Sequence, residues 1–177
     1  MKISLAEALP LRVELFRKIR ELRQERDAAS YIQYIEAPGV EVNEDELLPK
    51  RSMVEVTNEL NQVILDYTNL DQIISAMNIQ NTIDWRGTDL SIQSAINLAK
   101  MWRDELVMCK EFARKKPVMR NTSYSSANIS VIKLLYDPNT FSDMVKQLEK
   151  DLPRLSTAIE KKNHQVEFEF AAEAYLS

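Results

Sequence analysis

Hydrophobic residues recur along most of the chain with the spacing of three and four residues that is typical of an amphipathic α-helix. The pattern covers four segments, which are residues 4–28, 52–80, 91–115 and 138–164. Ser4 and Glu7 match a capping box at the start of the first segment. Asp137 followed by Pro138 is a favourable start for the last one. The sequence therefore predicts four helices.

The remaining segments predict β-structure or loop. Residues 117–136 are rich in Ser, Asn and β-branched residues, and they predict a hairpin that turns near residues 125–126. Within residues 166–170, Val and Phe alternate with Glu, which predicts a half-buried strand able to pair with that hairpin. Residues 29–51 carry Pro, Gly and an acidic run, so we expect a long solvated connection there.

These elements predict a mainly α fold, an antiparallel four-helix bundle with a small β-hairpin and strand element at one end. In the last helix, apolar residues repeat at alternating spacings of four and three, as they do along the seam of antiparallel bundles. The length of 177 residues fits a single helical-bundle domain, residues 1–177. The broad apolar faces of the first and third helices favour burial against another copy, so we expect a homo-oligomer.

Composition narrows the class of protein. Only 2 glycines are present, whereas phosphate-cradling loops and Rossmann turns need more of them, so those enzyme folds are disfavoured. The formal net charge of −4 disfavours a nucleic-acid polymer as partner. Charged residues interrupt the N-terminal segment where a secretory signal would need an apolar stretch. No stretch of the chain reaches the ~18 apolar residues of a membrane span. We expect a cytoplasmic protein of a bacterium or of a phage-infected host, with a membrane role disfavoured.

Short motifs along the chain match a known family in order and spacing. They are Leu5 to Leu9, Arg12, Ile19 to Arg23, Met77 to Thr82, Gly87 to Ser91, Arg103-Asp104, Arg120, Ser123, Lys133 and Ile159 to Asn163. Together they resemble the septicolysin-like family of small bacterial helical proteins. The resemblance implies a helical fold, and the family name implies a membrane-active cytolysin. The chain departs from the family where His164, and not an aromatic residue, follows Asn163, and in the loop from Ser30 to Lys50.

The residue types offer little for catalysis. His164 is the only histidine and has no obvious Ser or Cys partner. Cys109 lies on an apolar helix face, which favours a buried, inert thiol over a nucleophile. The Glu-x-x-His pair of helical metal sites is absent. We therefore expect no catalytic residues, no metal and no cofactor, in a protein that is not an enzyme.

Polar residues on otherwise apolar faces are the candidate site. They are Arg12, Asn78, Asn81, Arg103 and Asn163, to which the hairpin adds Arg120 and Lys133. One interpretation is that these residues are structural. The arginines would then pair with internal acceptors such as Glu59 or Glu7, or extend their guanidinium groups to the surface. The other is a pocket in which the cations bind an anion and the asparagines recognise a polar ring edge. Trp102 and Tyr124 can stack on a base, although Trp102 also suits the core.

Three functions are compatible with this pattern. The first is a non-enzymatic binding protein. It would sequester a small anionic nucleotide-like ligand in an Arg/Asn-lined pocket of an oligomeric bundle. Such a sponge for a signalling nucleotide would suit a virus-encoded inhibitor of host defence. The second is a structural or scaffold assembly protein, and the third is a septicolysin-like cytolysin. The candidate polar residues favour the first.

Overall fold

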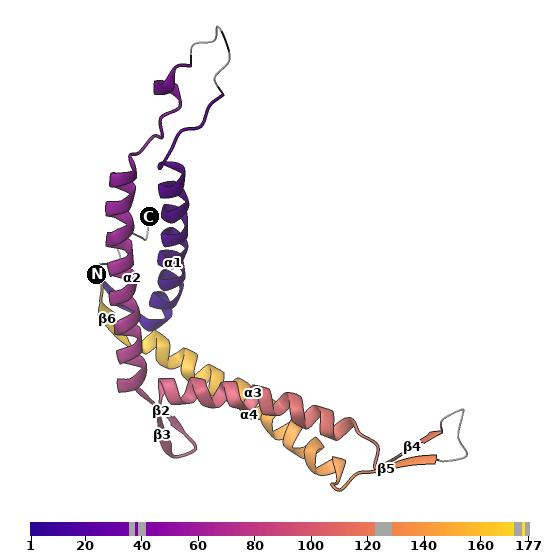
Figure 1. Cartoon of the computed structure of the whole chain (residues 1–177). Coiled ribbons are helices and arrows are strands. Elements are labelled where there is room, and N and C mark those ends of the chain that lie inside the picture. Colours follow the sequence, from indigo (N-terminus) through magenta and orange to yellow (C-terminus); the bar gives the residue numbers. More distant parts are fainter. Residues whose placement is uncertain (36–37, 39–41, 123–128, 172–174, 176–177) are drawn as a thin grey trace. The chain divides into compact units, whose positions relative to one another are not determined.

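Four helices with bounds close to the expected ones make up most of the protein (Figure 1). They are α1 (Leu5–Ala28), α2 (Met53–Gln80), α3 (Ile92–Arg114) and α4 (Pro138–Gln165), with a short 3₁₀ helix η1 (Glu44–Glu46). The computed structural model describes all residues except 36–37, 39–41, 123–128, 172–174 and 176–177. The prediction of a mainly α-helical fold is confirmed. No helix in the described part is long and apolar enough to cross a membrane.

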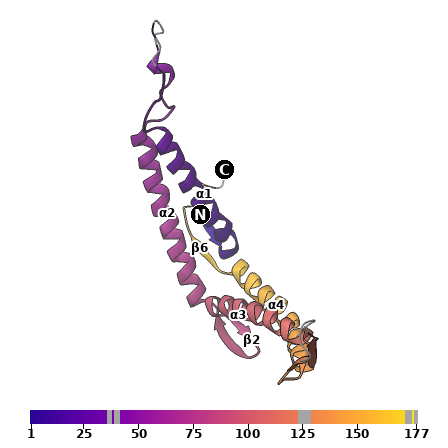
Figure 2. The same cartoon turned by 45° about the vertical axis from the view of Figure 1, so that its right-hand side comes forward.

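The chain divides into two compact units, and the four helices pack in pairs. The first unit comprises Met1–Met77 and Asn163–Ser177, and the second comprises Asn78–Lys162. In the first, α1 and α2 lie antiparallel, and in the second, α3 and α4 do the same (Figure 2). Each pair carries short two-stranded antiparallel sheets.

The first unit is built around the apolar stripes of α1 and α2. Fully buried side chains on these stripes are Leu5, Ala8, Leu15, Val56, Leu60, Val63, Leu70 and Ile74. The capping box at the start of α1 is confirmed, because Ser4 Oγ accepts the Glu7 N–H at 3.2 Å and the Ser4 N–H donates to Glu7 Oε2 at 2.7 Å. This cap supplies side-chain acceptors for backbone N–H groups that have no intrahelical partner at the start of a helix.

A sheet of the two chain termini completes this unit. Strand β6 (Glu167–Glu169) confirms the expected alternation, with Phe168 buried between exposed glutamates. The prediction that it pairs with the hairpin of residues 117–136 is wrong. Strand β6 pairs antiparallel with β1 (Lys2–Ser4), and Ile3 lies opposite Phe168. Because β1 is only three residues long and runs directly into α1, its sequence shows no strand period of its own.

The second unit combines α3 and α4 with two hairpins. The first hairpin, β2 (Thr82–Trp85) and β3 (Thr88–Ser91), turns through Arg86 and Gly87, whose φ angles of 55° and 79° suit a two-residue type I′ turn. Ser91 then caps α3 by accepting the Ser94 N–H at 3.0 Å.

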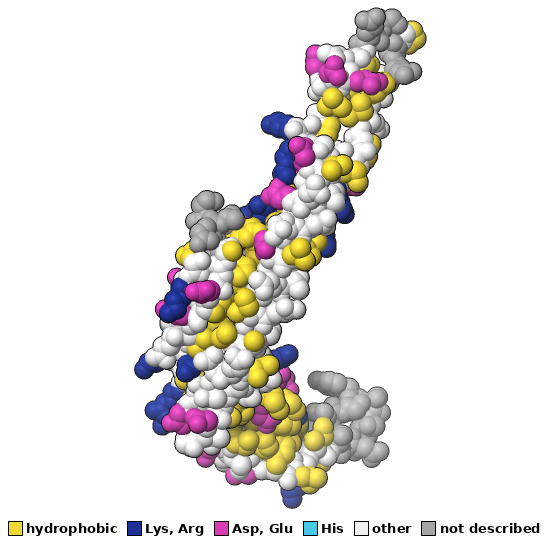
Figure 3. Space-filling model, turned by 90° about the vertical axis from the view of Figure 1, so that its left-hand side faces the viewer, with side chains coloured by type: hydrophobic (Ala, Val, Ile, Leu, Met, Phe, Trp, Pro, Cys, Tyr) yellow, Lys and Arg dark blue, Asp and Glu magenta, His cyan; other side chains and the backbone are white. Residues whose placement is uncertain are grey.

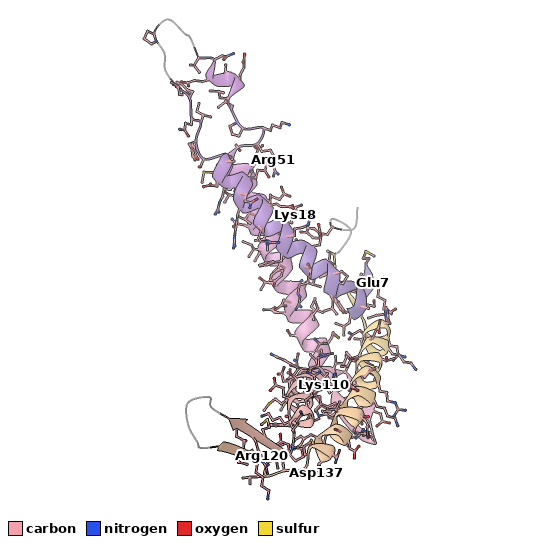
Figure 4. The ribbon with its side chains drawn as sticks, turned by 90° about the vertical axis from the view of Figure 1, so that its right-hand side faces the viewer. Glu7, Lys18, Arg51, Lys110, Arg120 and Asp137 are labelled. Carbon is pink, nitrogen blue, oxygen red and sulfur yellow. The ribbon has the colours of Figure 1, made fainter. Side chains whose placement is uncertain are left out.

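The second hairpin confirms the prediction for residues 117–136. It consists of β4 (Val118–Thr122) and β5 (Ile129–Lys133), and the predicted turn at residues 125–126 lies outside the described residues. At its base the rings of Phe112, Tyr136 and Phe141 cluster with centroid separations of 5.0–5.5 Å. Asp137 begins α4, since its Oδ1 accepts the Asn139 N–H at 2.9 Å (Figure 4).

The helix stripes generate a stability prediction. Leu70 is fully buried on α2, whereas Leu65 on the same helix is 64% exposed. We expect Leu70→Ala to lower the free energy of unfolding by about 2–5 kcal/mol, because it removes buried methyl groups and leaves a cavity. The matched change Leu65→Ala should alter it by less than about 0.5 kcal/mol. Urea denaturation followed by circular dichroism measures both, and equal losses would contradict this assignment of the core.

Candidate functional site

The seven candidate residues are divided between the two units. Arg12 and Asn163 belong to the first unit; Asn78, Asn81, Arg103, Arg120 and Lys133 belong to the second. Each candidate lies on a helix, at a helix end or on a hairpin.

Arg12 is a half-buried cation that bridges α1 and α2. Its Nη1 donates to Asp71 Oδ1 at 2.8 Å, and the two side chains remain 36% and 45% exposed. The expected partners Glu59 and Glu7 are therefore wrong. Glu59 instead accepts from Lys18 at 2.7 Å and from Arg51, while Glu7 is held by the Ser4 cap. Arg12 thus has an internal partner yet stays accessible to solvent.

A hollow of about 380 Å³ lies beside Arg12 in the first unit. Its lining is Arg12, Val13, Phe16 and Tyr67. The rings of Phe16 and Tyr67 lie 5.9 Å apart between centroids at an interplanar angle of 44°, and Phe16 is 49% exposed. This hollow combines a guanidinium with two aromatic rings, the groups that bind an anion and a planar ring.

Arg103 does not lie within the buried face of α3, where the sequence placed it. Its side chain is exposed, and its Nη2 donates to Ser156 Oγ on α4 at 3.3 Å. The predicted face was too broad, since α3 buries Ile92, Ala95, Ala99 and Cys109 and leaves Val107 60% exposed. A helix that packs against one neighbour buries a narrow stripe, so arginines at the edge of a wide apolar arc remain in solvent.

The two cations of the second hairpin share one face. In the antiparallel register Arg120 lies opposite Val131 and Val118 lies opposite Lys133, so these four side chains project from the same side. All four are exposed (Figure 4 labels Arg120). Neither cation forms an ion pair with another described residue. Tyr124 and Ser123, the other hairpin residues of interest, lie outside the described residues.

The three asparagines occupy helix ends. Asn78 is half-buried in the last turn of α2, and Asn163 is half-buried in the last turn of α4. Asn81 follows α2, and its carbonyl accepts the Ile92 N–H at 2.9 Å, which ties the start of α3 to the end of α2. Their recognition of a ring edge stays a prediction. Trp102 is half-buried and packs against Trp85 with a centroid separation of 6.1 Å.

Sequence reasoning missed a buried carboxylate on α4. Asp151 is only 3% exposed and accepts from Arg86 on the β2–β3 turn and from Gln147 Nε2 at 2.7 Å. The hydrogen bond from Arg86, and then that from Gln147, hold the pKa of Asp151 below its usual value, against the effect of burial. A signal was present: Asp151 follows Leu148 by three residues and precedes Leu155 by four, so it lies on the apolar seam.

Cys109 and His164 differ in their exposure to solvent. Cys109 is buried, and its thiol donates to Glu105 Oε1 at 3.4 Å. Burial, followed by that hydrogen bond, raises the pKa of Cys109, which keeps the thiol protonated at neutral pH. His164 is exposed. Within the described residues no group of three or more His, Cys, Asp and Glu side chains is arranged to hold a metal ion.

One solved structure shares this architecture. No protein-family model and no curated protein matches the chain. The chain is similar to the crystal structure of a functionally unknown conserved protein from Corynebacterium diphtheriae, with 20% sequence identity and a TM-score of 0.64. The match covers 96% of this chain and 100% of that one. At this identity the similarity shows a shared fold with a conserved bacterial protein and says nothing of activity.

The Asp151 contact generates a pH-dependent prediction. We expect Asp151→Asn to lower the free energy of unfolding at pH 7 by about 1–3 kcal/mol, because it weakens a charge-assisted hydrogen bond in a buried setting. Since the pKa of Asp151 is lowered by folding, its stabilisation is present at neutral pH and is lost as the pH falls through the lowered value. The difference between the two proteins should therefore shrink below about pH 4.

The readout is urea denaturation followed by tryptophan fluorescence. The chain has 2 tryptophans, and both Trp85 and Trp102 lie beside the Arg86 turn. The matched control is Asp143→Asn, since that carboxylate is also on α4 but its side chain is 75% exposed. A loss of stability that is equal in the two variants at pH 7 would refute a special role for Asp151.

Proposed function

We propose that this protein is a non-enzymatic binding protein for a small anionic, nucleotide-like molecule, and that the hollow beside Arg12 is its contact site. The observation that carries the proposal is the presence of Arg12, Phe16 and Tyr67 around one hollow of about 380 Å³. That volume falls in the range of roughly 300–1,000 Å³ that is usual for small-molecule sites. The remaining candidates are secondary to it.

The chemistry of the lining fits the two halves of a nucleotide. A guanidinium has five N–H donors, and Asp71 engages one end of Arg12, so other donors stay available to a phosphate oxygen. The rings of Phe16, which is 49% exposed, and of half-buried Tyr67 suit the base, because stacking on an aromatic side chain contributes about 1–3 kcal/mol per base. Val13 adds an apolar wall that is mostly open to solvent.

Asp71 favours a nucleotide over a simple anion. Its carboxylate lies 2.8 Å from the Arg12 guanidinium and repels any phosphate that approaches the same group. A ligand that also carries a hydroxyl or a ring N–H can donate to Asp71 while its phosphate accepts from Arg12. Inorganic phosphate has no comparable second interaction with the aromatic rings. The pair therefore selects ligands with both an anionic and a hydrogen-bond-donating part.

The role that we propose is sequestration without chemical change. The protein would act as a subunit of a homo-oligomer in the cytoplasm of a bacterium or a phage-infected host, and would lower the free concentration of a signalling nucleotide. A septicolysin-like relationship is part of this proposal at the level of the helical fold. The lytic activity that the family name implies is the competing function, and it predicts dye release from liposomes by purified protein.

Ligand binding provides the test of the Arg12 hollow. Native mass spectrometry of freshly purified protein identifies any retained anion, and isothermal titration calorimetry then measures nucleoside monophosphates, diphosphates and cyclic dinucleotides. We expect Arg12→Gln to raise the Kd at least about tenfold, since one charge-assisted hydrogen bond is worth about 1.5–3 kcal/mol. Asp71→Asn should lower the Kd several-fold, because it removes the repelling charge and keeps a side-chain oxygen that accepts from the ligand.

The control is Arg23→Gln, which removes an exposed cation from the same helix and should leave the Kd unchanged. A purely structural Arg12–Asp71 pair gives a different pattern. In that case Arg12→Gln and Asp71→Asn both lower the unfolding midpoint and neither changes ligand affinity. That result, or release of liposome-trapped dye at micromolar protein, would overturn the proposal.

A further inference from the structure

Charge is segregated along the chain into two segments of opposite sign. Residues 112–136 contain five Lys and Arg and no Asp or Glu. Residues 28–49 contain five Asp and Glu and no Lys or Arg. The first segment includes the β4–β5 hairpin, and the second is the connection between α1 and α2. Within its own unit, the described strands β4 and β5 lie beyond the ends of α3 and α4, and η1 lies beyond the ends of α1 and α2 (Figure 1).

The hairpin presents apolar as well as basic side chains. We call the set Val118, Arg120, Val131 and Lys133 the basic hairpin face. Val118 and Val131 are 46% and 57% exposed, and each lies opposite one of the two cations in the antiparallel register. A two-stranded sheet is at best marginally stable in water and normally requires cover on an apolar face. The basic hairpin face therefore fits a partner that carries both carboxylates and apolar groups.

The connection between α1 and α2 has that chemistry. We call its described residues Glu44, Asp45, Glu46, Leu47 and Leu48 the acidic connection. All five are exposed, and at the upper end of Figure 3 acidic and hydrophobic side chains lie side by side. None of its carboxylates forms an ion pair with another described residue. The Tyr34 hydroxyl donates to Glu44 Oε1 at 2.6 Å, and Asn43 Nδ2 donates to Glu46 Oε1 at 2.8 Å, which orients two of them.

We propose that the basic hairpin face of one chain binds the acidic connection of a second copy of the same chain. Opposite charges steer the two surfaces together and fix their register, while the leucines cover the valines. A phosphate-bearing ligand would neutralise Arg120 and Lys133 but would leave Val118 and Val131 in solvent. The two cations, which the sequence assigned to a ligand, are thus better explained by a protein partner.

The contact joins two different surfaces, and every chain carries both. Such a head-to-tail contact closes into a ring where the rotation between neighbours allows it, and otherwise grows with concentration. The inference therefore specifies how a homo-oligomer forms and does not depend on the ligand. Arg12→Gln, which tests the ligand, is expected to leave the mass of the assembly unchanged.

A charge-exchange experiment tests the contact. The first variant, Arg120→Glu with Lys133→Glu, makes the hairpin face acidic; the second, Asp45→Lys with Glu46→Lys, makes the connection basic. We expect each variant alone to sediment as a smaller species than the wild type in analytical ultracentrifugation, with a self-association Kd raised at least about tenfold. Mixing the two variants in equal amounts should restore assembly, because each then offers the charge that the other lacks.

Matched controls separate this contact from a general effect of charge. Lys150→Glu with Lys161→Glu changes the net charge by the same amount as the first variant, at exposed positions of α4, and should leave assembly intact. Circular dichroism verifies that each variant is folded. Raising sodium chloride from about 50 mM to about 500 mM should weaken the wild-type assembly.

Three outcomes would overturn the proposal. The wild type sediments as a single chain at every concentration, either variant keeps the wild-type mass, or the mixture of the two fails to reassemble. If the two surfaces met only within one chain, the wild type would sediment as a single chain at every concentration. The experiment therefore distinguishes that contact from the proposed contact between copies.

Discussion

Helices that pack in pairs can bury only one stripe each, and this constraint governs the rest of the structure. In the first unit the stripes of α1 and α2 meet through fully buried residues such as Leu15, Leu60 and Leu70. Two stripes enclose only a small core, so ion pairs at the edge of the contact do more to fix the register of α1 against α2. Lys18 and Arg51 both reach Glu59, and Arg51 also reaches Glu25 at 3.2 Å, which joins α1, α2 and the connection (Figure 4).

In each unit, short strands and turns provide partners for polar groups that the helix pair alone does not satisfy. The β1–β6 sheet covers the start of α1, and the Leu5 N–H donates to the Val166 carbonyl at 2.8 Å. In the second unit, the Arg86 turn reaches Asp151 on α4 and carries Trp85 onto Trp102. Both devices satisfy backbone or charged groups that a bare helix pair would expose or bury without a partner.

The same constraint explains which features were predictable from the sequence. Helix bounds, the Ser4 cap, the β4–β5 hairpin and the alternation in β6 follow from local patterns, and these predictions are confirmed. Pairing between segments is non-local, which is why the β1–β6 partner was wrong and the Arg86–Asp151 contact was missed.

The sequence identified the candidate residues, but it did not predict their burial or their partners. A helical wheel finds the apolar arc correctly and overestimates how much of it a single neighbour covers. Arg103 was therefore placed in a core although it is exposed. Arg12 was correctly expected to need an acceptor, but the choice of Asp71 depends on the register of α1 against α2. No local pattern encodes that register.

The energetics of the Arg12–Asp71 pair bear on why such a pair lies beside the aromatic rings of Phe16 and Tyr67. Both side chains are more than a third exposed, and an ion pair in that setting contributes only about 0–1 kcal/mol to stability. Nearby, α1 and α2 are already aligned by Lys18 and Glu59 and by the buried stripe. A ligand that shares the Arg12 guanidinium with Asp71 would cost the fold little, while stacking on Phe16 and Tyr67 would supply more than the pair provides. An accessible, weakly stabilising ion pair next to aromatic rings would thus accept an added ligand without loss of the helix packing.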